Sequence, residues 1–329
     1  MSKIILGCMS YGTPEWQPWV LSEEQSLPLL EYAYKAGINT WDTADVYSMG
    51  RSEEIVGKAL AKFNIPRYGV TILSKCYFGV TDDGSFPPVG GAMATNDGQM
   101  VNRVGLSRKH IFDAVEASVR RLGTYIDVLQ IHRLDRETPK EEIMRALNDV
   151  IEKGWVRYIG ASSMAAWEFQ QLQDIAERHG WHKFISMQNY YNAIYREEER
   201  EMIPCCKANG VSLIPWSPIA RGVLARPWDD RSSTRQSTDG TLQRIIRSNE
   251  SAADKEIVDR VEQLAKKKGV TMAQVAIAWV LRKGSTYPIV GLSSKDRIDQ
   301  AVAAIKVELS DEESAFIEEP YAPKPIIGY

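Results

Sequence analysis

Four side chains suited to proton transfer lie at, or just after, the ends of three apolar segments. Asp42 ends the segment INTWD (38–42), and Tyr47 follows it in the stretch DTADVY. Lys75 ends GVTILSK (69–75), and His132 ends IDVLQIH (126–132). Any turn needs polar residues, so each of these side chains alone has a plain structural explanation. Together, a carboxylate, a phenol, an ammonium and an imidazole could act on one oxygen atom.

The chemistry expected of this set is proton donation by Tyr47. A free phenol has a pKa of about 10, and a neighbouring ammonium lowers that pKa. Lys75 could be that ammonium, and Asp42 could keep Lys75 charged despite burial. His132 could donate a hydrogen bond that polarises a carbonyl group. Because the set holds no nucleophile and no metal-ligand cluster, we expect the electrons to arrive as hydride from a nicotinamide.

The pattern along the chain indicates the elements that must position these side chains. Short runs rich in β-branched residues alternate with segments of helical periodicity, and Gly180 and Gly269 each end such a segment. Strands are predicted at residues 4–7, 38–42, 69–75, 126–132, 156–162, 184–188, 211–216 and 287–291. Eight alternating units predict an α/β fold, the (β/α)8 TIM barrel, as one domain over residues 1–329. The C-terminal ends of the strands would then meet at one mouth.

Three stretches interrupt the alternation. They cover about residues 76–107, about 217–252 and a tail at about 308–329. The first two follow the third and seventh predicted strands, so they are expected as long loops at the C-terminal face, where such loops usually serve function. The alternative is that they are only flexible connections.

Composition limits the class of protein and its partners. The chain has 329 residues, a net charge of −3 and no basic stripe, so nucleic acid and anionic membranes are not expected partners. No apolar run is long enough for a signal peptide or a membrane span, which predicts a cytoplasmic protein. Cys8, Cys76, Cys205 and Cys206 show no CxxC spacing and are expected to be reduced thiols. The four histidines form no ligand pattern, so no metal is expected.

A phosphate-binding segment is predicted after the last strand. No GxGxxG follows the first strand, so a Rossmann fingerprint is missing. In GLSSKDRIDQA (291–301), Ser293 and Ser294 stand at a predicted helix N-terminus, where backbone N–H groups accept an anion. Lys295 and Arg297 place cations where they oppose the helix dipole, which favours a bound phosphate, specifically the 2′-phosphate of NADPH. The alternative is two ordinary surface charges.

Several longer stretches resemble the aldo-keto reductase family, over about residues 4–310. They are GINTWDTADVYSMGRSEEIVGKAL, ILSKCY, YIDVLQIHRLDRETP, GWVRYIGASSM, MQNYYNAIYREEEREMIPCCKANGVSLIPWSPIARGVL and PIVGLSSKDRI. The pattern is more similar to the fungal aryl-alcohol dehydrogenase branch than to the aldose reductase branch. The resemblance implies an NADPH-dependent carbonyl reductase on a (β/α)8 barrel.

The resemblance also implies roles for individual residues. Tyr47 matches the general acid, Lys75 and Asp42 match its tuning partners, and His132 matches the residue that orients the carbonyl. The positions matched to the nicotinamide carboxamide are Ser162, Ser163 and Gln188, and the ring-stacking position is Trp216, which could also simply fill the core. The pyrophosphate loop is matched by Ser217, Pro218, Ile219 and Ala220, and the adenosine phosphate site, in the segment that begins at Gly291, by Ser293, Arg297 and Gln300. Ala301 departs from the asparagine that is common in the family.

The substrate is the least determined feature. An aromatic pocket could be lined by Trp16, Trp19, Tyr77, Phe78, Phe86 and Trp228, although each could also pack within its own loop. The expected reaction is the reduction of a small-molecule aldehyde or ketone, aromatic or bulky, to the alcohol. The alternative is a cofactor-binding regulatory subunit of the channel β-subunit type with little turnover. Isomerase or lyase chemistry is a third alternative, and the oligomeric state is not indicated.

Overall fold

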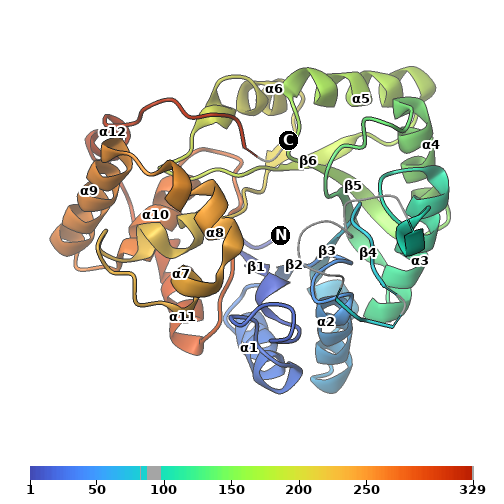
Figure 1. Ribbon diagram of the computed structural model, residues 1–329, viewed down its shortest axis with the longest axis horizontal. Helices are drawn as coiled ribbons and strands as arrows, with labels where there is room; N and C mark the ends of the chain where they lie inside the picture. Colours follow the sequence, from blue (N-terminus) through green and yellow to red (C-terminus); the bar gives the residue numbers. More distant parts are fainter. Residues whose placement is uncertain (82, 87–97, 328–329) are drawn as a thin grey trace.

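The computed structural model describes residues 1–81, 83–86 and 98–327, in which eight parallel strands form one curled sheet surrounded by helices (Figure 1). The strands are β1 (Ile5–Gly7), β2 (Thr40–Asp42), β3 (Thr71–Cys76), β4 (Ile126–Ile131), β5 (Val156–Ser162), β6 (Phe184–Gln188), β7 (Ser212–Leu213) and β8 (Ile289–Val290). Their order in the sheet is β7-β6-β5-β4-β3-β2-β1-β8. Each predicted strand is present, so the (β/α)8 fold class is confirmed.

The barrel closes between β7 and β8 through backbone contacts outside the regular ladders. Leu213 bridges to Thr286, and Trp216 bridges to Ile289. The N–H of Ile289 donates to the carbonyl oxygen of Pro215 over 2.9 Å. β7 is shorter than the predicted 211–216 because Pro215 has no N–H to contribute to a ladder.

Helices surround the sheet, most of them on its outer face. They are α1 (Glu23–Lys35), α2 (Arg51–Lys62), α3 (Arg108–Leu122), α4 (Lys140–Glu152), α5 (Ala166–His179), α6 (Met202–Ala208), α7 (Thr234–Thr238), α8 (Gly240–Ile245), α9 (Ala252–Lys268), α10 (Met272–Leu281), α11 (Lys295–Ala304) and α12 (Asp311–Glu318). Gly180 and Gly269 end α5 and α9 with φ of 64° and 66°, a left-handed conformation that glycine adopts without strain. In the described part of the chain, no helix is both long and apolar enough to cross a bilayer.

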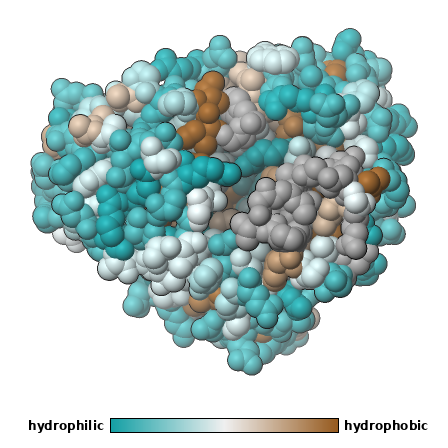
Figure 2. All heavy atoms as spheres, in the orientation of Figure 1, coloured by the Kyte–Doolittle hydropathy of each residue, from teal (hydrophilic) through white to brown (hydrophobic). Residues whose placement is uncertain are grey.

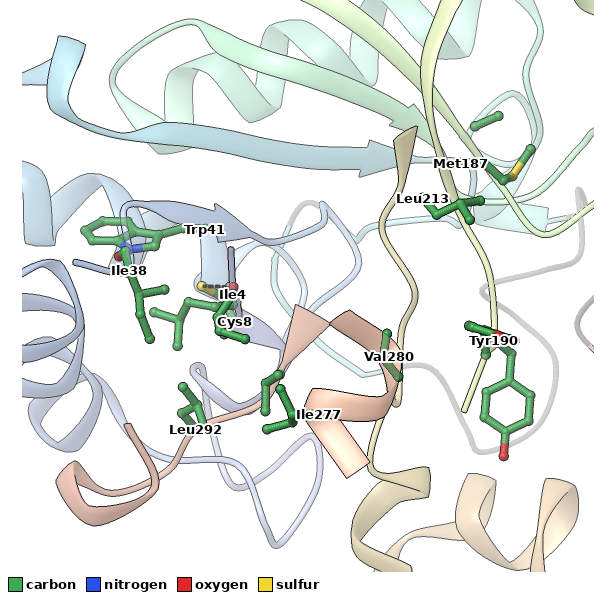
Figure 3. Close-up of a cluster of buried hydrophobic side chains, with 14 of the residues drawn as sticks. Ile4, Cys8, Ile38, Trp41, Met187, Tyr190, Leu213, Ile277, Val280 and Leu292 are labelled. Carbon is green, nitrogen blue, oxygen red and sulfur yellow. Dashed lines mark hydrogen bonds between the residues drawn. The ribbon is translucent and has the colours of Figure 1, made fainter. Parts of the chain in front are cut away.

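Apolar side chains fill the space between the sheet and these helices. Figure 3 shows part of this core, with Trp41 of β2, Met187 of β6 and Ile277 of α10. Trp41 is fully buried, and its indole N–H donates to the carbonyl oxygen of Ile38 over 2.9 Å. Burial therefore costs this large side chain no unsatisfied donor.

Inside the barrel, the side chains change from apolar to polar towards the mouth. The apolar layer consists of Ile5, Leu73, Val128, Ile214 and Ile289. Side chains along a strand alternate in direction, so residues two positions apart lie on the same side. Lys75 follows Leu73 by two residues on β3, and Gln130 follows Val128 by two on β4. The strands thus place a polar layer directly next to an apolar one.

The stretches that interrupt the alternation contain short helices of their own. Residues 217–252 include η5 (Ala220–Ala225), α7, α8 and η6 (Arg247–Asn249). Residues 76–107 include η3 (Gly98–Met100), and positions 82 and 87–97 of this stretch lie outside the described residues. The predicted tail contains α12, which the sequence analysis did not anticipate.

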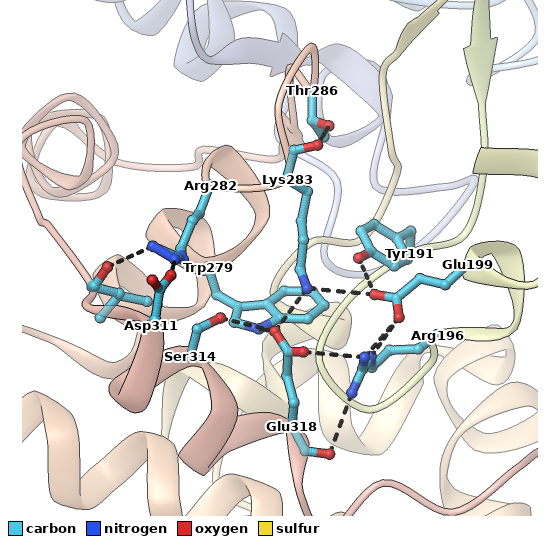
Figure 4. Close-up of polar contacts among 11 residues, drawn as sticks. Tyr191, Arg196, Glu199, Trp279, Arg282, Lys283, Thr286, Asp311, Ser314 and Glu318 are labelled. Atoms are coloured by element: carbon cyan, nitrogen blue, oxygen red, sulfur yellow. Dashed lines mark hydrogen bonds and ion pairs between the residues drawn. The ribbon is translucent and has the colours of Figure 1, made fainter. Parts of the chain in front are cut away.

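A network of polar side chains holds α12 and the chain beyond it against the barrel (Figure 4). Oε1 of Glu318 accepts hydrogen bonds from Lys283 Nζ at 2.7 Å and from Trp279 Nε1 at 2.8 Å. The guanidinium of Arg196 lies 3.2 Å from the Glu318 carboxylate. The backbone N–H of Arg196 donates to the hydroxyl of Tyr321 over 2.9 Å. These contacts fix the course of the chain after α12.

Candidate active site

Lys75 on β3 is fully buried and lies at the centre of the site. Its ammonium donates to Asp42 Oδ2 at 2.7 Å, to the carbonyl oxygen of Thr43 at 2.8 Å and to the hydroxyl of Tyr47 at 3.2 Å. Asp42 ends β2, which pairs with β3, and the turn after β2 brings Tyr47 over the ammonium. Three of the four groups identified in the sequence are therefore in direct contact.

Two buried glutamines hold Asp42 from the other side. Nε2 of Gln130 on β4 and Nε2 of Gln188 on β6 each donate to Asp42 Oδ1 at 3.0 Å. Gln188 also donates to Oε1 of Gln130 at 2.8 Å, which fixes the orientation of that amide. Gly160 on β5 leaves the necessary space, because a Cβ there would lie 3.1 Å from Cγ of Gln130 and 2.5 Å from Oγ of Ser186. Both oxygens of Asp42 are thus hydrogen-bonded.

The pKa values of Tyr47 and Lys75 are both shifted upward. Burial raises the pKa of Tyr47, the ammonium of Lys75 lowers it, and the Asp42 carboxylate raises it. The net rise differs from the expected acidified phenol, because loss of solvation of the phenolate outweighs the attraction of one cation. Burial lowers the pKa of Lys75, but Asp42 and Tyr47 raise it above its ordinary value. At neutral pH, Tyr47 therefore holds its proton and Lys75 its charge.

His132 follows β4 and packs edge-on against two aromatic rings. Its ring centroid is 5.9 Å from that of Tyr47 and 5.0 Å from that of Phe78. Burial lowers the pKa of His132 well below its ordinary value, and the charges of Lys75 and Arg133 lower it further. The imidazole is therefore neutral at pH 7, with one N–H that can donate to a carbonyl oxygen. Its Nδ1 has no hydrogen-bond partner among the residues described.

Two adjoining cavities lie at the mouth of the barrel. The larger, of about 780 Å³, is lined by Tyr47 and His132, and Figure 2 shows a recess near the centre of this face. The second, of about 730 Å³, extends to Arg297. The two share lining residues, including Ile219, Arg221, Arg235 and Gly291. They therefore form one groove, along which no three His, Cys, Asp or Glu side chains of the described chain are grouped to hold a metal ion.

Most of the predicted site residues line this groove. The larger cavity is lined by Asp42, Tyr47, Tyr77, Phe78, His132, Ser162, Gln188, Trp216, Ser217, Pro218, Ile219 and Gly291. The second is lined by Ser293, Arg297 and Gln300. Trp216 lines the larger cavity and also stacks on Tyr190, with ring centroids 4.6 Å apart.

Two predicted residues point elsewhere. The ammonium of Lys295 lies 5.3 Å from the ring centroid of Tyr32 in α1, outside the lining of the groove. Lys295 and Arg297 are two residues apart on α11, and a helix turns about 200° over two residues, so the two cations face different sides. Trp228 packs against arginine side chains of its own insertion and lines neither cavity. This matches the alternative considered for the aromatic residues.

Four further predicted residues lie behind the lining. Ser163 and Ala220 are buried and have φ of 42° and 48°. Ser294 caps α11, because its Oγ accepts the backbone N–H of Arg297 at 3.3 Å. Trp16 packs on Tyr47, with ring centroids 6.0 Å apart. These residues shape the site without facing the groove directly.

The donors of the groove suit a phosphorylated dinucleotide. Arg221 and Arg235 lie 2.6 Å and 3.1 Å from the carboxylate of Asp239, so two cations share one anion. Nε of Arg221 is buried without a hydrogen-bond partner in the described residues, and Nε of Arg235 is buried with only its 3.1 Å ion pair to Asp239. Burial and the charge of Arg221 lower the pKa of Arg235 to about 10, and Arg297 acts in the same direction. Phosphate groups would supply both the missing charge and the missing acceptors.

Several residues that contact the site were not predicted from the sequence. Gln130 precedes His132 by two residues, and the alternation of β4 could have placed it beside the reacting groups. Arg133 follows His132 directly and also lines the larger cavity. Arg221 and Arg235 carry no spacing signal, because the folding of the insertion alone brings them together.

Comparison with known proteins decides the family. The model of the aldo/keto reductase family matches residues 3–322. The chain belongs to the aldo/keto reductase family. This aldo-keto reductase is 69% identical to versiconal hemiacetal acetate reductase of Aspergillus parasiticus, over 99% of its own chain and 95% of that protein. It is 50% identical to an aldo-keto reductase of Fusarium vanettenii and 48% identical to one of Alternaria alternata, with 100% of this chain and 90% of each relative covered.

These matches confirm the resemblance that the motifs indicated. The aldo-keto reductase is an oxidoreductase, and its family and its reductase relatives support carbonyl reduction as its reaction. Members of the family generally use NAD(P)H, which agrees with the donors found in the groove.

Proposed function

We propose that this aldo-keto reductase reduces an aldehyde or ketone with NADPH and that Tyr47 donates the proton. The observation that carries the proposal is the 3.2 Å contact between Lys75 Nζ and the hydroxyl of Tyr47. When Tyr47 gives up its proton, the ammonium already lies where the negative charge develops, and no reorganisation is needed. Asp42 and its two glutamine partners keep that ammonium in place.

The residues of the chain would act on the carbonyl oxygen in two ways. The N–H of His132 would orient and polarise the carbonyl group, and Tyr47 would transfer its hydroxyl proton to the oxygen as charge develops there. The cofactor, when bound, supplies the hydride. A neutral His132 suits this role because it adds no second cation beside Lys75.

The groove offers a place for each part of the cofactor. Both amide N–H bonds of Gln188 are used, so its carbonyl oxygen is the atom left to accept from a carboxamide. Trp216 presents a ring face to the larger cavity for stacking. Arg221 and Arg235 would hold the pyrophosphate. Arg297, which donates to the hydroxyl of Ser293, would hold the 2′-phosphate together with that serine.

For the substrate, we propose only a chemical class and not a single compound. The name of the Aspergillus parasiticus relative specifies a hemiacetal acetate. Tyr77, Phe78 and Trp216 line the larger cavity beside His132. These aromatic walls support a bulky or aromatic carbonyl compound as substrate.

Tyr47→Phe tests the proposed proton donor. We expect kcat for aromatic aldehydes to fall about 10²- to 10⁴-fold while the affinity for NADPH stays nearly unchanged. Tyr68→Phe is the matched control, because Tyr68 is 92% exposed. An unaltered kcat in Tyr47→Phe would remove this residue from its role. Tight NADPH binding by the unmodified enzyme without turnover of any carbonyl compound would favour the regulatory alternative.

Arg297→Ala tests the proposed cofactor preference. Loss of a charge-assisted contact should weaken NADPH about 10- to 100-fold and NADH far less, measured by fluorescence titration. Lys295→Ala should have a much smaller effect, because its ammonium lies over Tyr32. Equal weakening of both cofactors by Arg297→Ala would refute the 2′-phosphate assignment.

A further inference from the structure

Five arginines line the larger cavity, and their charges are neutralised unequally. They are Arg133, Arg136, Arg221, Arg235 and Arg244. Arg136 donates to both oxygens of Glu168, at 2.7 Å and 2.9 Å. Arg221 and Arg235 share Asp239 and also line the second cavity, at the end of the groove that suits phosphate groups. Three of the five cations therefore have a carboxylate partner in the protein.

Arg133 is half-buried and has no carboxylate partner among the described residues. Nη1 donates to the carbonyl oxygen of His132 at 2.6 Å, and the remaining N–H bonds have no partner in the described chain. The groups whose charge acts on Arg133 are Tyr47, Tyr77 and Arg244, and none of them is an acid of the Asp or Glu kind. Arg133 lies close enough to Tyr47 for its charge to lower the pKa of the hydroxyl.

A half-buried guanidinium without a counter-ion loses part of its solvation without compensation, and a second cation nearby adds to this cost. Arg244, from α8 of the 217–252 insertion, lines the same cavity and repels Arg133. Arg133 does not line the second cavity, whereas Arg221 and Arg235, which share Asp239, line both cavities. An anion that pairs with Arg133 would therefore lie in the larger cavity, which Tyr47 and His132 also line and where the substrate would bind.

We propose that Arg133 recognises a carboxylate on the substrate, so that the enzyme prefers carbonyl compounds that carry an acid group near the reacting carbonyl. The planar guanidinium still has parallel N–H bonds to offer, the arrangement that binds a carboxylate through two hydrogen bonds. Tyr77, Phe78 and Trp216 line the same cavity, so an aromatic framework that carries the acid group would contact aromatic side chains there. The proposal rests on the carbonyl reduction proposed above.

Carboxybenzaldehydes and their methyl esters provide the test. The 2-, 3- and 4-carboxy isomers differ in the position of the acid, and each ester has the same ring and aldehyde without the charge. With NADPH, at least one acid should have a kcat/KM about 10- to 100-fold above its ester, the effect of a hydrogen bond to a charged group. In Arg133→Gln this ratio should fall to near one, and Arg133→Lys should restore part of it.

The ratio separates recognition from an effect on the proton donor. Acid and ester use the same Tyr47, so a change in its acidity alters both kcat/KM values equally and cancels. Arg145→Gln removes the same charge from the exposed side of α4 and should leave the ratio unchanged. Acid-to-ester ratios near one for all three isomers, or equal losses for acid and ester in Arg133→Gln, would overturn the proposal.

A binding measurement keeps this test independent of turnover. In Tyr47→Phe with bound NADP⁺, calorimetry should show the preferred acid binding about 10- to 100-fold more tightly than its ester, and the added Arg133→Gln change should abolish the difference. No difference in binding would overturn the role of Arg133. Acid-selective binding together with no turnover by the unmodified enzyme would instead overturn the proposed reaction and keep the anion site.

Discussion

Gln130→Met should separate the positioning of Asp42 from the stability of the fold. Gln130 donates to Asp42 Oδ1 at 3.0 Å and accepts from Gln188 at 2.8 Å. Methionine keeps the unbranched shape that fits beside Gly160 but makes neither bond. A hydrogen bond to a charged group contributes about 1.5–3 kcal/mol, and the unpaired N–H of Gln188 adds about 1–3 kcal/mol, partly offset by the more apolar side chain. We expect a loss of about 2–4 kcal/mol in the free energy of unfolding.

The same substitution should lower kcat about 10- to 100-fold. Asp42 would keep its contact with Lys75 but lose one of the two amides that fix its other oxygen. A displacement of about 1 Å in such a group costs on the order of 10²-fold in rate. Both quantities are measurable, by urea unfolding and by steady-state kinetics at saturating aldehyde and NADPH.

Gln173→Met is the matched control for this experiment. Gln173 is also buried, donates to the carbonyl oxygen of Phe184 at 3.0 Å and accepts its N–H at 2.9 Å. It therefore loses two hydrogen bonds as well, but far from the reacting groups. We expect Gln173→Met to lower the free energy of unfolding about as much as Gln130→Met does, but to leave kcat unchanged. An unchanged kcat in Gln130→Met, or the same fall in both variants, would refute the positioning role.

Further predictions concern pH and the chain after α10. Burial depresses the pKa of His132, so below about pH 6.5 the unfolded chain binds a proton that the folded chain does not. The contribution of His132 to the free energy of unfolding should therefore be fully present above pH 6.5. Below that pH it should fall by up to about 1.4 kcal/mol per pH unit. His132→Gln should flatten this slope in urea unfolding at pH 7.5 and 5.5, and an equally steep slope would contradict the assignment. Glu318→Gln weakens the contacts with Lys283 and Trp279 and should lower stability by about 1–3 kcal/mol without changing kcat, whereas exposed Glu312→Gln should cost under about 0.5 kcal/mol. A loss of activity in Glu318→Gln would show that the network supports the site as well.

The sequence by itself determined the order of elements and the type of chemistry. Strands and helices form from patterns within a few residues, so eight β-branched runs and helix-ending glycines such as Gly180 predicted the barrel. Since barrel strands end at one mouth, the positions of Asp42, Lys75 and His132 also predicted that they would converge. The turn after β2 then placed Tyr47 with them.

Only the tertiary structure decided which side chains touch and which charged groups have no partner of opposite charge. Asp42 bonds to Gln130 and Gln188, which lie 88 and 146 residues further along the chain, and no local pattern marks such a pair. In the sequence, Arg133 cannot be told from an ordinary surface arginine. The packing of the surrounding elements shows that no carboxylate of the described chain contacts it. Hydrogen bonding and charge balance depend on the closure of the barrel, which joins distant segments, whereas helix and strand formation depends on sequence neighbours.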